Sequence, residues 1–148
     1  MKLYKNYIDG KWLESETKDI IHVDDPATGK IIGEISCAKK NEVDLAVSAA
    51  KAAFNSRVLV DMPLLERAKL MHRIADETRK IADEGGKMLC YENGKMLGAA
   101  IKEFNDVADM FDYYAGLTDK LEGKTIPVSP TVFDYTVLEP FGVSAHIV

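Results

Sequence analysis

The chain has 148 residues, of which 47% are hydrophobic and 29% are charged, the balance of an ordinary soluble protein long enough for one real core. Its net charge of −5 provides no general attraction for a phosphate backbone, so nucleic acid is excluded as an expected partner. No apolar run approaches the roughly 20 residues that span a bilayer, and the first residues lack the apolar segment of a signal peptide. We therefore expect a cytoplasmic protein that has no membrane partner.

The start of the chain predicts a small β meander. Asp9-Gly10 stands between two short β-prone pieces, and both residues tolerate positive φ, which favours a hairpin. Further strands are expected over 20–23 and 31–36, on either side of a turn at 24–30 that contains proline and glycine. This section carries no catalytic signature, and we expect it to pack on something larger.

Helical periodicity begins at Asn41, which is expected to cap the first helix. The apolar residues of this helix fall on one face, and they are Val43, Val47, Ala50 and Phe54. Asp61 and Pro63 are expected to open a second helix that ends near Asp83, because Gly85-Gly86 weakens a straight continuation. The predicted buried stripe of the second helix consists of Leu64, Ala68, Met71 and Ala75.

A short helix over 87–93 is predicted next, with Gly94 as its carboxyl-terminal cap. The longest apolar stripe of the chain follows, at steps of three and four residues, and it consists of Leu97, Ile101, Phe104, Ala108, Phe111 and Ala115. Burial of one phenylalanine is worth roughly 1.5–3 kcal/mol, so this third long helix is expected to face a core or a partner.

The end of the chain predicts extended structure. Two prolines keep residues 125–130 out of a helix, and the run over 131–138 is rich in β-branched and aromatic residues, which favours a strand that another surface covers. Residues 143–148 form a short apolar run that is typical of a strand buried in a parallel sheet. A parallel strand pairs with a neighbour that is reached through a crossover of a dozen or more residues, and no such neighbour follows this run. We therefore expect the chain to stop where an α/β core begins.

Candidate reactive groups are sparse. We expect the two cysteines to be small buried hydrophobic residues and the three histidines to be structural, and these residues are Cys37, Cys90, His22, His72 and His146. None matches a metal-ligand spacing, so no metal site is predicted. Glu92-Asn93-Gly94-Lys95 and Glu122-Gly123-Lys124-Thr125 lack the spacing of a phosphate-binding loop, and we interpret them as a helix cap and a loop.

Seven short motifs occur in a recognisable order along the chain. They are Tyr7-Ile8-Asp9-Gly10-Lys11-Trp12, Asp25-Pro26-Ala27-Thr28-Gly29-Lys30, Glu66-Arg67-Ala68, Glu92-Asn93-Gly94-Lys95, Tyr113-Tyr114-Ala115-Gly116, Glu122-Gly123-Lys124-Thr125-Ile126-Pro127 and Glu139-Pro140-Phe141-Gly142-Val143. Each motif is weak by itself, but together they resemble the amino-terminal section of the NAD(P)-dependent aldehyde dehydrogenase superfamily over essentially the whole chain. That section is about the first third of an enzyme with several domains.

The resemblance implies an α/β fold: the amino-terminal part of a Rossmann-like cofactor domain, incomplete as it stands, with a small β meander, then helices, then an arm strand and the first core strand. Residues 1–124 would begin the cofactor-binding domain, residues 125–140 would belong to an oligomerisation arm that pairs with another subunit, and residues 141–148 would be the first strand of the parallel core. Ile147 and Val148 would lie at the nicotinamide half of an NAD or NADP site. Glu103 stands near the position where some relatives offer an acidic group to a monovalent cation, but a solvated helix face is the favoured interpretation.

The chemistry that the resemblance implies needs a cysteine thiolate that attacks the aldehyde, oxyanion donors, hydride transfer to the nicotinamide and a glutamate-activated water. The catalytic Cys, the Glu and the oxyanion Asn belong to later family motifs that have no match here, so no catalytic residue is assigned. Two hypotheses follow. In the first, the chain is the amino-terminal piece (truncated, engineered or one half of a split protein) of a cytosolic, homo-oligomeric enzyme that oxidises a small-molecule aldehyde to a carboxylic acid, and the piece is inactive alone. In the second, it is a complete, non-catalytic interaction module that associates with a full-length relative.

Overall fold

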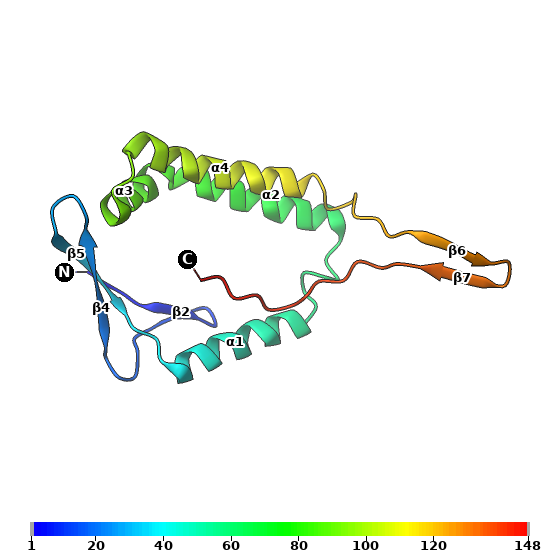
Figure 1. The fold of residues 1–148 in the computed structure, drawn as a ribbon, viewed down its shortest axis with the longest axis horizontal. Helices are drawn as coiled ribbons and strands as arrows, with labels where there is room; N and C mark the ends of the chain where they lie inside the picture. The colour runs from blue at the N-terminus through cyan, green and yellow to red at the C-terminus, as the bar shows by residue number, and fades with distance from the viewer. Residues whose placement is uncertain (1, 148) are drawn as a thin grey trace.

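The structure is a computed structural model that describes residues 2–147. Its elements in chain order are β1 (Leu3–Tyr4), β2 (Asn6–Ile8), β3 (Lys11–Leu13), β4 (Ile20–Asp25), β5 (Lys30–Ser36), α1 (Lys40–Asn55), α2 (Leu64–Lys80), α3 (Ala82–Asn93), α4 (Leu97–Ala115), β6 (Thr125–Ser129) and β7 (Val132–Tyr135). Helices α2, α3 and α4 form one layer, α1 lies apart from that layer, and the β6–β7 hairpin projects far from the rest (Figure 1).

The first strands confirm the predicted meander and place it in two small sheets. One is a three-stranded sheet in the order β1-β5-β4, with β1 parallel and β4 antiparallel to β5. The other is the β2–β3 hairpin, whose turn residues Asp9 and Gly10 have φ values of 50° and 75°. Asp25 ends β4, because its carboxylate accepts hydrogen bonds from the Ala27 amide and the Thr28 hydroxyl, both at 2.8 Å, and so closes the following turn.

Helix α1 begins at Lys40, two residues earlier than a cap at Asn41 implies, and Asn41 is not its cap. Lys39 occupies the N-cap position, and its backbone N–H donates to the Glu42 carboxylate at 3.0 Å. The same carboxylate accepts from the Glu16 amide (2.8 Å) and from the Ser15 hydroxyl (3.1 Å), so it ties the helix to the connection between β3 and β4. These donors, the Glu16 amide foremost, hold the pKa of Glu42 at about 2, below its ordinary value of 4.5.

Glu42→Ala is therefore expected to loosen the start of α1. The buried carboxylate caps the helix and accepts three hydrogen bonds, so its loss should speed amide hydrogen exchange over residues 40–43 by roughly 10-fold. Because the pKa of Glu42 is depressed in the folded chain, its contribution is complete above about pH 4.5 and is lost as the pH falls from there toward 2. Asp44→Ala is the matched control, since Asp44 pairs only with the exposed Lys40; equal acceleration in both variants would contradict the assignment.

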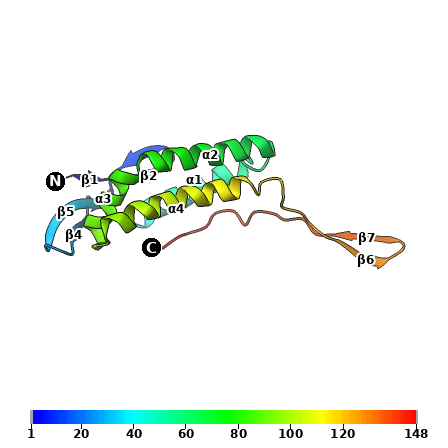
Figure 2. The ribbon, with the colours of Figure 1, turned by 90° about the horizontal axis from the view of Figure 1, so that it is seen from above.

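Helix α4 lies against both α2 and α3, as the longest apolar stripe predicts. Ala100 and Ala108 are fully buried on α4 and Ala75 is fully buried on α2, while Phe104 and Phe111 are half-buried. Figure 2 shows α2 and α4 running alongside each other over most of their length. The third predicted helix is thus confirmed, with the bounds Leu97–Ala115.

The glycine pair does not end a helix, contrary to the prediction. Helix α2 ends at Lys80, and α3 runs through Gly85-Gly86 to the predicted cap Gly94, whose φ is 73°. The pair is needed for packing, because a Cβ atom on Gly85 would lie 2.2 Å from the Phe104 ring and one on Gly86 would lie 2.9 Å from the Cα atom of Ile101. Close helix packing therefore outweighs the helical cost of two glycines.

Gly86→Ala is expected to destabilise the packing of α3 on α4 by about 1–3 kcal/mol, because the new methyl group would overlap the Ile101 backbone, which cannot rotate away. Gly98→Ala in α4 is the matched control. No atom lies within 4 Å of a Cβ at that position, so alanine should stabilise the helix by about 0.4–1 kcal/mol. Hydrogen exchange of α4 amides measures both changes. A change of the same sign in the exchange rates of the two variants would refute the packing argument.

The chain ends in a hairpin and an irregular segment. Strands β6 and β7 pair in antiparallel fashion, so residues 125–130 are the partner of the predicted strand rather than a simple connection. Residues 136–147 carry no regular secondary structure, and the strand expected over 143–148 is not formed in the part that the structure describes. No described strand pairs with this segment, and a strand needs such a partner for its backbone hydrogen bonds.

A large apolar surface remains uncovered. The chain exposes 11606 Å², whereas a compact monomer of 16.4 kDa exposes about 7,500 Å². Helix α1 packs chiefly on β2, so its predicted apolar face is not buried, and Val43, Val47 and Phe54 are 51%, 48% and 37% exposed. Leu64 and Leu97 at the starts of α2 and α4 are also exposed. The periodicity correctly identified these faces, but the described residues do not cover them.

Candidate functional site

The predicted cofactor residues lie at the end of the carboxyl-terminal segment. Ile147 is 99% exposed, and Val148 lies outside the described residues. In the view of Figure 1 the segment runs between α1 and the three-helix layer. The structure thus leaves Ile147 without neighbours that would form a binding site around it.

The same segment contacts the end of α1 a few residues earlier. Gly142 has a φ of 105°, and a Cβ atom there would lie 3.5 Å from the Phe54 ring. A cavity of about 370 Å³ opens beside this contact, lined mainly by apolar residues of α1 and of the loop after it. Its one cation, Arg57, is paired with Asp61 at 2.8 Å, and this carboxylate raises the pKa of Arg57 above its ordinary value. Ser144 also lines the cavity, and its hydroxyl lies 3.3 Å from His146 Nε2, but both residues are exposed on the irregular carboxyl-terminal segment.

Neither glycine–lysine motif is arranged to bind a phosphate. Gly94 caps the carboxyl end of α3, where the helix dipole repels anions, and the Lys95 ammonium is paired with Glu103. At the second motif, the Lys124 backbone N–H donates to the Thr136 hydroxyl at 2.8 Å, at the base of the β6–β7 hairpin. These contacts support the interpretation of both motifs as a cap and a loop.

The two cysteines, His22 and His72 have surroundings that fit a structural role, and His22 Nδ1 lies 3.7 Å from the Glu34 carboxylate. Cys37 and Cys90 are free and half-buried, so the expectation of full burial was too strong. The Lys39 ammonium lies 3.8 Å from the Cys37 sulfur. His72 is hydrogen-bonded to Asp112 on α4, with 2.6 Å between Nδ1 and Oδ1. Within residues 2–147 no three His, Cys, Asp or Glu side chains gather closely enough to hold a metal ion.

His72 belongs to an ionic cluster that joins α2 to α4. The Arg79 guanidinium donates to Asp112 at 2.5 Å and to Asp109 at 2.7 Å. The hydrogen bond from His72 and the contact with Arg79 hold the pKa of Asp112 below its ordinary value, and the two aspartates raise the pKa of Arg79. Each member has a hydrogen-bond partner within the cluster, so the cluster links the helices rather than providing a free acid or base.

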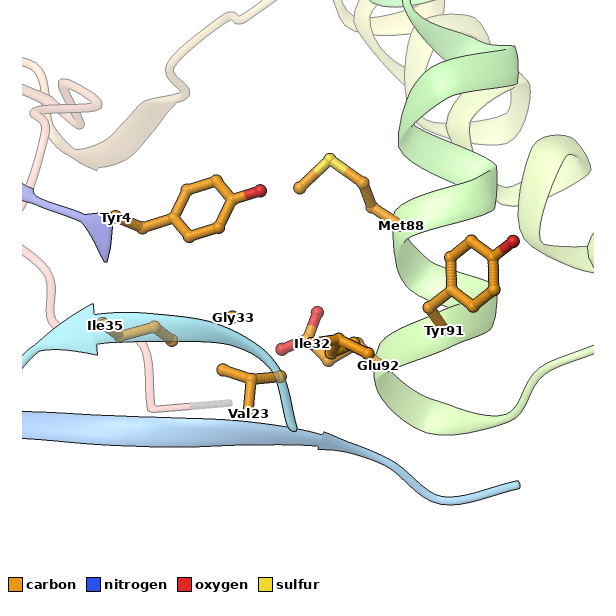
Figure 3. A pocket seen from close by; sticks show the side chains of 8 residues that line it. All are labelled: Tyr4, Val23, Ile32, Gly33, Ile35, Met88, Tyr91 and Glu92. Atoms are coloured by element: carbon orange, nitrogen blue, oxygen red, sulfur yellow. The ribbon is translucent and has the colours of Figure 1, made fainter. Parts of the chain in front are cut away.

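A second and larger cavity, of about 550 Å³, lies between the three-stranded sheet and α3 (Figure 3). Its lining residues come from β1, β4, β5 and α3, and they are Tyr4, Val23, Ile32, Gly33, Ile35, Met88, Tyr91 and Glu92. We call this cavity the sheet–α3 groove. The sequence analysis missed it, although Met88, Tyr91 and Glu92 recur at the spacing of one helix face next to a cap.

The model of the aldehyde dehydrogenase family matches residues 12–148 of this chain. The chain belongs to the aldehyde dehydrogenase family. Retinal dehydrogenase 2 of Homo sapiens is 35% identical over 150 residues, a match that covers 100% of this chain and 29% of that protein. Aldehyde dehydrogenase family 2 member C4 of Arabidopsis thaliana is 32% identical, with 100% of this chain and 30% of that protein covered.

Solved aldehyde dehydrogenases have the same fold over most of this chain. An NAD+ complex of a betaine aldehyde dehydrogenase variant from Staphylococcus aureus matches with a TM-score of 0.78 and 30% identity, over 86% of this chain and 25% of that one. The NAD+ complex of an aldehyde dehydrogenase from Bacillus cereus matches with a TM-score of 0.82 and 29% identity, over 89% and 27%. The predicted α/β fold and family are thus confirmed.

This chain spans less than a third of the length of the relatives that it matches. That coverage agrees with the placement of its residues: the described part contains outer helices, small sheets and a hairpin but brings together no cysteine with a general base. No helix among residues 2–147 is long and apolar enough to cross a membrane. The alternative of a stand-alone interaction module receives no support from these relatives.

Proposed function

We propose that this chain is the amino-terminal portion of an NAD(P)-dependent aldehyde dehydrogenase, a cytoplasmic enzyme that oxidises a small-molecule aldehyde to a carboxylic acid. The observation that carries the proposal is the family match over residues 12–148 together with the likeness to two aldehyde dehydrogenases that hold NAD+. The reacting cysteine, glutamate and oxyanion donor belong to parts of the family that have no counterpart in these residues. This portion therefore acts as structural support for the reaction.

The described residues do not by themselves fit the cofactor. Gly94-Lys95 and Gly123-Lys124 are engaged as a cap and a hairpin base, and Ile147 offers only an apolar side chain. In the proposal, residues 1–124 form the amino-terminal part of the cofactor-binding domain, and residues 141–148 become the first core strand once neighbouring strands are present. Ile147 and Val148 then lie beside the nicotinamide half of the cofactor. Most of the NAD or NADP site is supplied by residues outside this chain.

The proposal assigns residues 125–140 to the arm that pairs with another subunit of a homo-oligomer. Every residue of β6 and β7 is exposed, although many of them are apolar. The exposed apolar side chains of this segment are Ile126, Val128, Val132, Phe133, Tyr135, Val137 and Leu138. A two-stranded hairpin with two free edges is marginal in water and gains stability when another strand or sheet covers it.

The coding sequence and its full product test this function. We expect the reading frame to continue past Val148 into Pro-Trp-Asn and, much later, a cysteine-containing motif. The product of that frame should reduce NAD+ or NADP+ when an aldehyde is added. A genuine stop codon after Val148, in a gene whose product is soluble and inactive, would favour the interaction module instead.

A further inference from the structure

The end of α3 carries a side chain that can react with its own backbone. Asn93 is the last residue of this helix, and Gly94 follows it as the cap. The side-chain carbonyl of an asparagine is open to attack by the backbone nitrogen of the next residue, which is one reason that asparagine is thermolabile. A side chain on that next residue hinders the attack, and glycine has none. The motif that caps α3 therefore also contains a reactive pair.

Asn93 is the one asparagine of the sequence that precedes a glycine. The other asparagines are Asn6, Asn41, Asn55 and Asn105, and they precede tyrosine, glutamate, serine and aspartate. Asn55 is the best internal comparison, because it also ends a helix, α1, and is also exposed. The residue after it, Ser56, has a side chain and a φ of −67°. The chain thus contains two exposed helix-terminal asparagines that differ in the residue whose nitrogen would attack.

The folded turn keeps the reactive pair of α3 from reacting. The Gly94 N–H donates to the Cys90 carbonyl at 3.0 Å, so the attacking nitrogen is engaged. The Asn93 side-chain oxygen accepts from the Lys95 N–H at 2.9 Å, which fixes the carbonyl that would be attacked. A Cβ atom at Gly94 would lie 3.2 Å from the Pro26 ring, so the cap lies close to the turn between β4 and β5. Attack therefore requires that the last turn of α3 open and leave that turn.

We propose that Asn93 is a self-modification site whose rate is set by opening of the last turn of α3. In the open turn, the Gly94 nitrogen gives up its proton and forms a bond to the side-chain carbonyl carbon of Asn93. The bond from that carbon to the side-chain nitrogen breaks, and the nitrogen takes the proton and leaves as ammonia. Water then opens the resulting succinimide ring at either of its carbonyl carbons, which gives aspartate or isoaspartate at position 93. The reaction consumes only water, and it is independent of the aldehyde chemistry proposed above.

The product is expected to loosen the contact between α3 and the three-stranded sheet. It adds a carboxylate beside Glu92 in the last turn of α3, where the helix dipole already disfavours negative charge. Isoaspartate also lengthens the backbone before Gly94 by one methylene group, which moves the cap away from Pro26. Hydrogen exchange over residues 90–94 should therefore be faster in the converted chain. Unchanged exchange there would contradict this consequence.

Peptide mapping by mass spectrometry tests the site after the full chain is incubated at mildly alkaline pH. Asn93 is expected to convert about 10-fold faster than Asn55 in the same sample, because no side chain hinders the glycine nitrogen. It should also convert about 5–20-fold more slowly than in a chain unfolded by guanidinium, because the folded turn opens only part of the time. Equal rates in the folded and unfolded chains would overturn the control by the turn. An intact Asn93 in the folded chain, after the unfolded chain has converted fully, would overturn the site itself.

A matched pair of proline variants tests the control by the turn. Pro26→Ala removes the ring beside Gly94, so it should raise both the conversion rate of Asn93 and the hydrogen exchange of the Gly94 amide by about 3–5-fold. Pro127→Ala lies in the hairpin that projects from the rest of the chain, and it should change neither rate (Figure 1). Failure of either rate to rise in Pro26→Ala would refute the link between opening and reaction. Should that variant unfold, the comparison of the folded and unfolded parent chains still decides.

Discussion

Phe104→Asp is expected to disrupt the three-helix layer and to send most of the protein into the insoluble fraction. The Phe104 ring packs directly over Gly85 of α3, in a space that no other side chain fills. Loss of such a ring costs about 3–5 kcal/mol, and an aspartate in its place adds the cost of a carboxylate without a partner. The sum is comparable to the whole stability of a typical domain.

The control for this variant is Val107→Asp on the same helix. Val107 is 45% exposed at the edge of the buried stripe, so a carboxylate there can reach water and solubility should change much less. Soluble yield and helical circular dichroism are measured for both variants. If Phe104→Asp were as soluble and as helical as the parent chain, the predicted stripe would not be a core.

The isolated chain is expected to unfold gradually and to bind an apolar dye before it unfolds. Its exposed surface exceeds that of a compact monomer by about 4,000 Å², and no large side chain among residues 2–147 is completely buried. The three-helix layer has the packed interior, whereas α1, the hairpin and residues 136–147 have little to hold them. We therefore expect separate, non-coincident transitions for helix content and for the surroundings of Trp12 in β3, together with a tendency to aggregate.

Thermal unfolding followed by two probes measures this directly. Far-ultraviolet dichroism reports the helices, and the fluorescence of Trp12, the one tryptophan of the sequence, reports the β2–β3 hairpin. A single sharp transition that coincides for both probes, in a monomer that binds no apolar dye, would show that the described residues form a complete cooperative unit. The uncovered faces would then need another explanation.

Local patterns predicted most of the elements correctly. Asp9-Gly10 forms the turn of β2–β3, because the preference for positive φ is a property of the residues themselves. Gly94 caps α3 for the same reason. The stripe of α4 also follows from spacing alone, since three- and four-residue steps place side chains on one face.

The wrong predictions depend on residues far apart in sequence. Asn41 is not the cap, because the Glu42 carboxylate accepts hydrogen bonds from Ser15 and Glu16 and fixes the start of the helix. These donors are distant in sequence, so no local pattern reveals them. The Gly85-Gly86 pair stays helical because α4 packs against it. The strand over 143–148 has the right composition, but strand formation requires a partner that is absent from residues 2–147.

The site was the least predictable part. The family resemblance indicated Ile147 and Val148, and the described structure leaves Ile147 exposed and alone. The sheet–α3 groove escaped prediction because its two walls are separated by some 50 residues, and only the fold brings Tyr4 and Ile32 opposite Met88. Sequence patterns identify which faces are apolar, but they do not identify which faces meet.

The central claim is that these residues support a redox reaction whose reacting groups lie outside the chain. The most direct test is to incubate the purified chain with NAD+ or NADP+ and a panel of aldehydes, and to follow formation of the reduced nicotinamide by absorbance. We predict no aldehyde-dependent reduction above the level of a heat-treated sample. Reduction that depends on both the aldehyde and the intact chain, and that disappears when Cys37 or Cys90 is replaced by serine, would contradict the account.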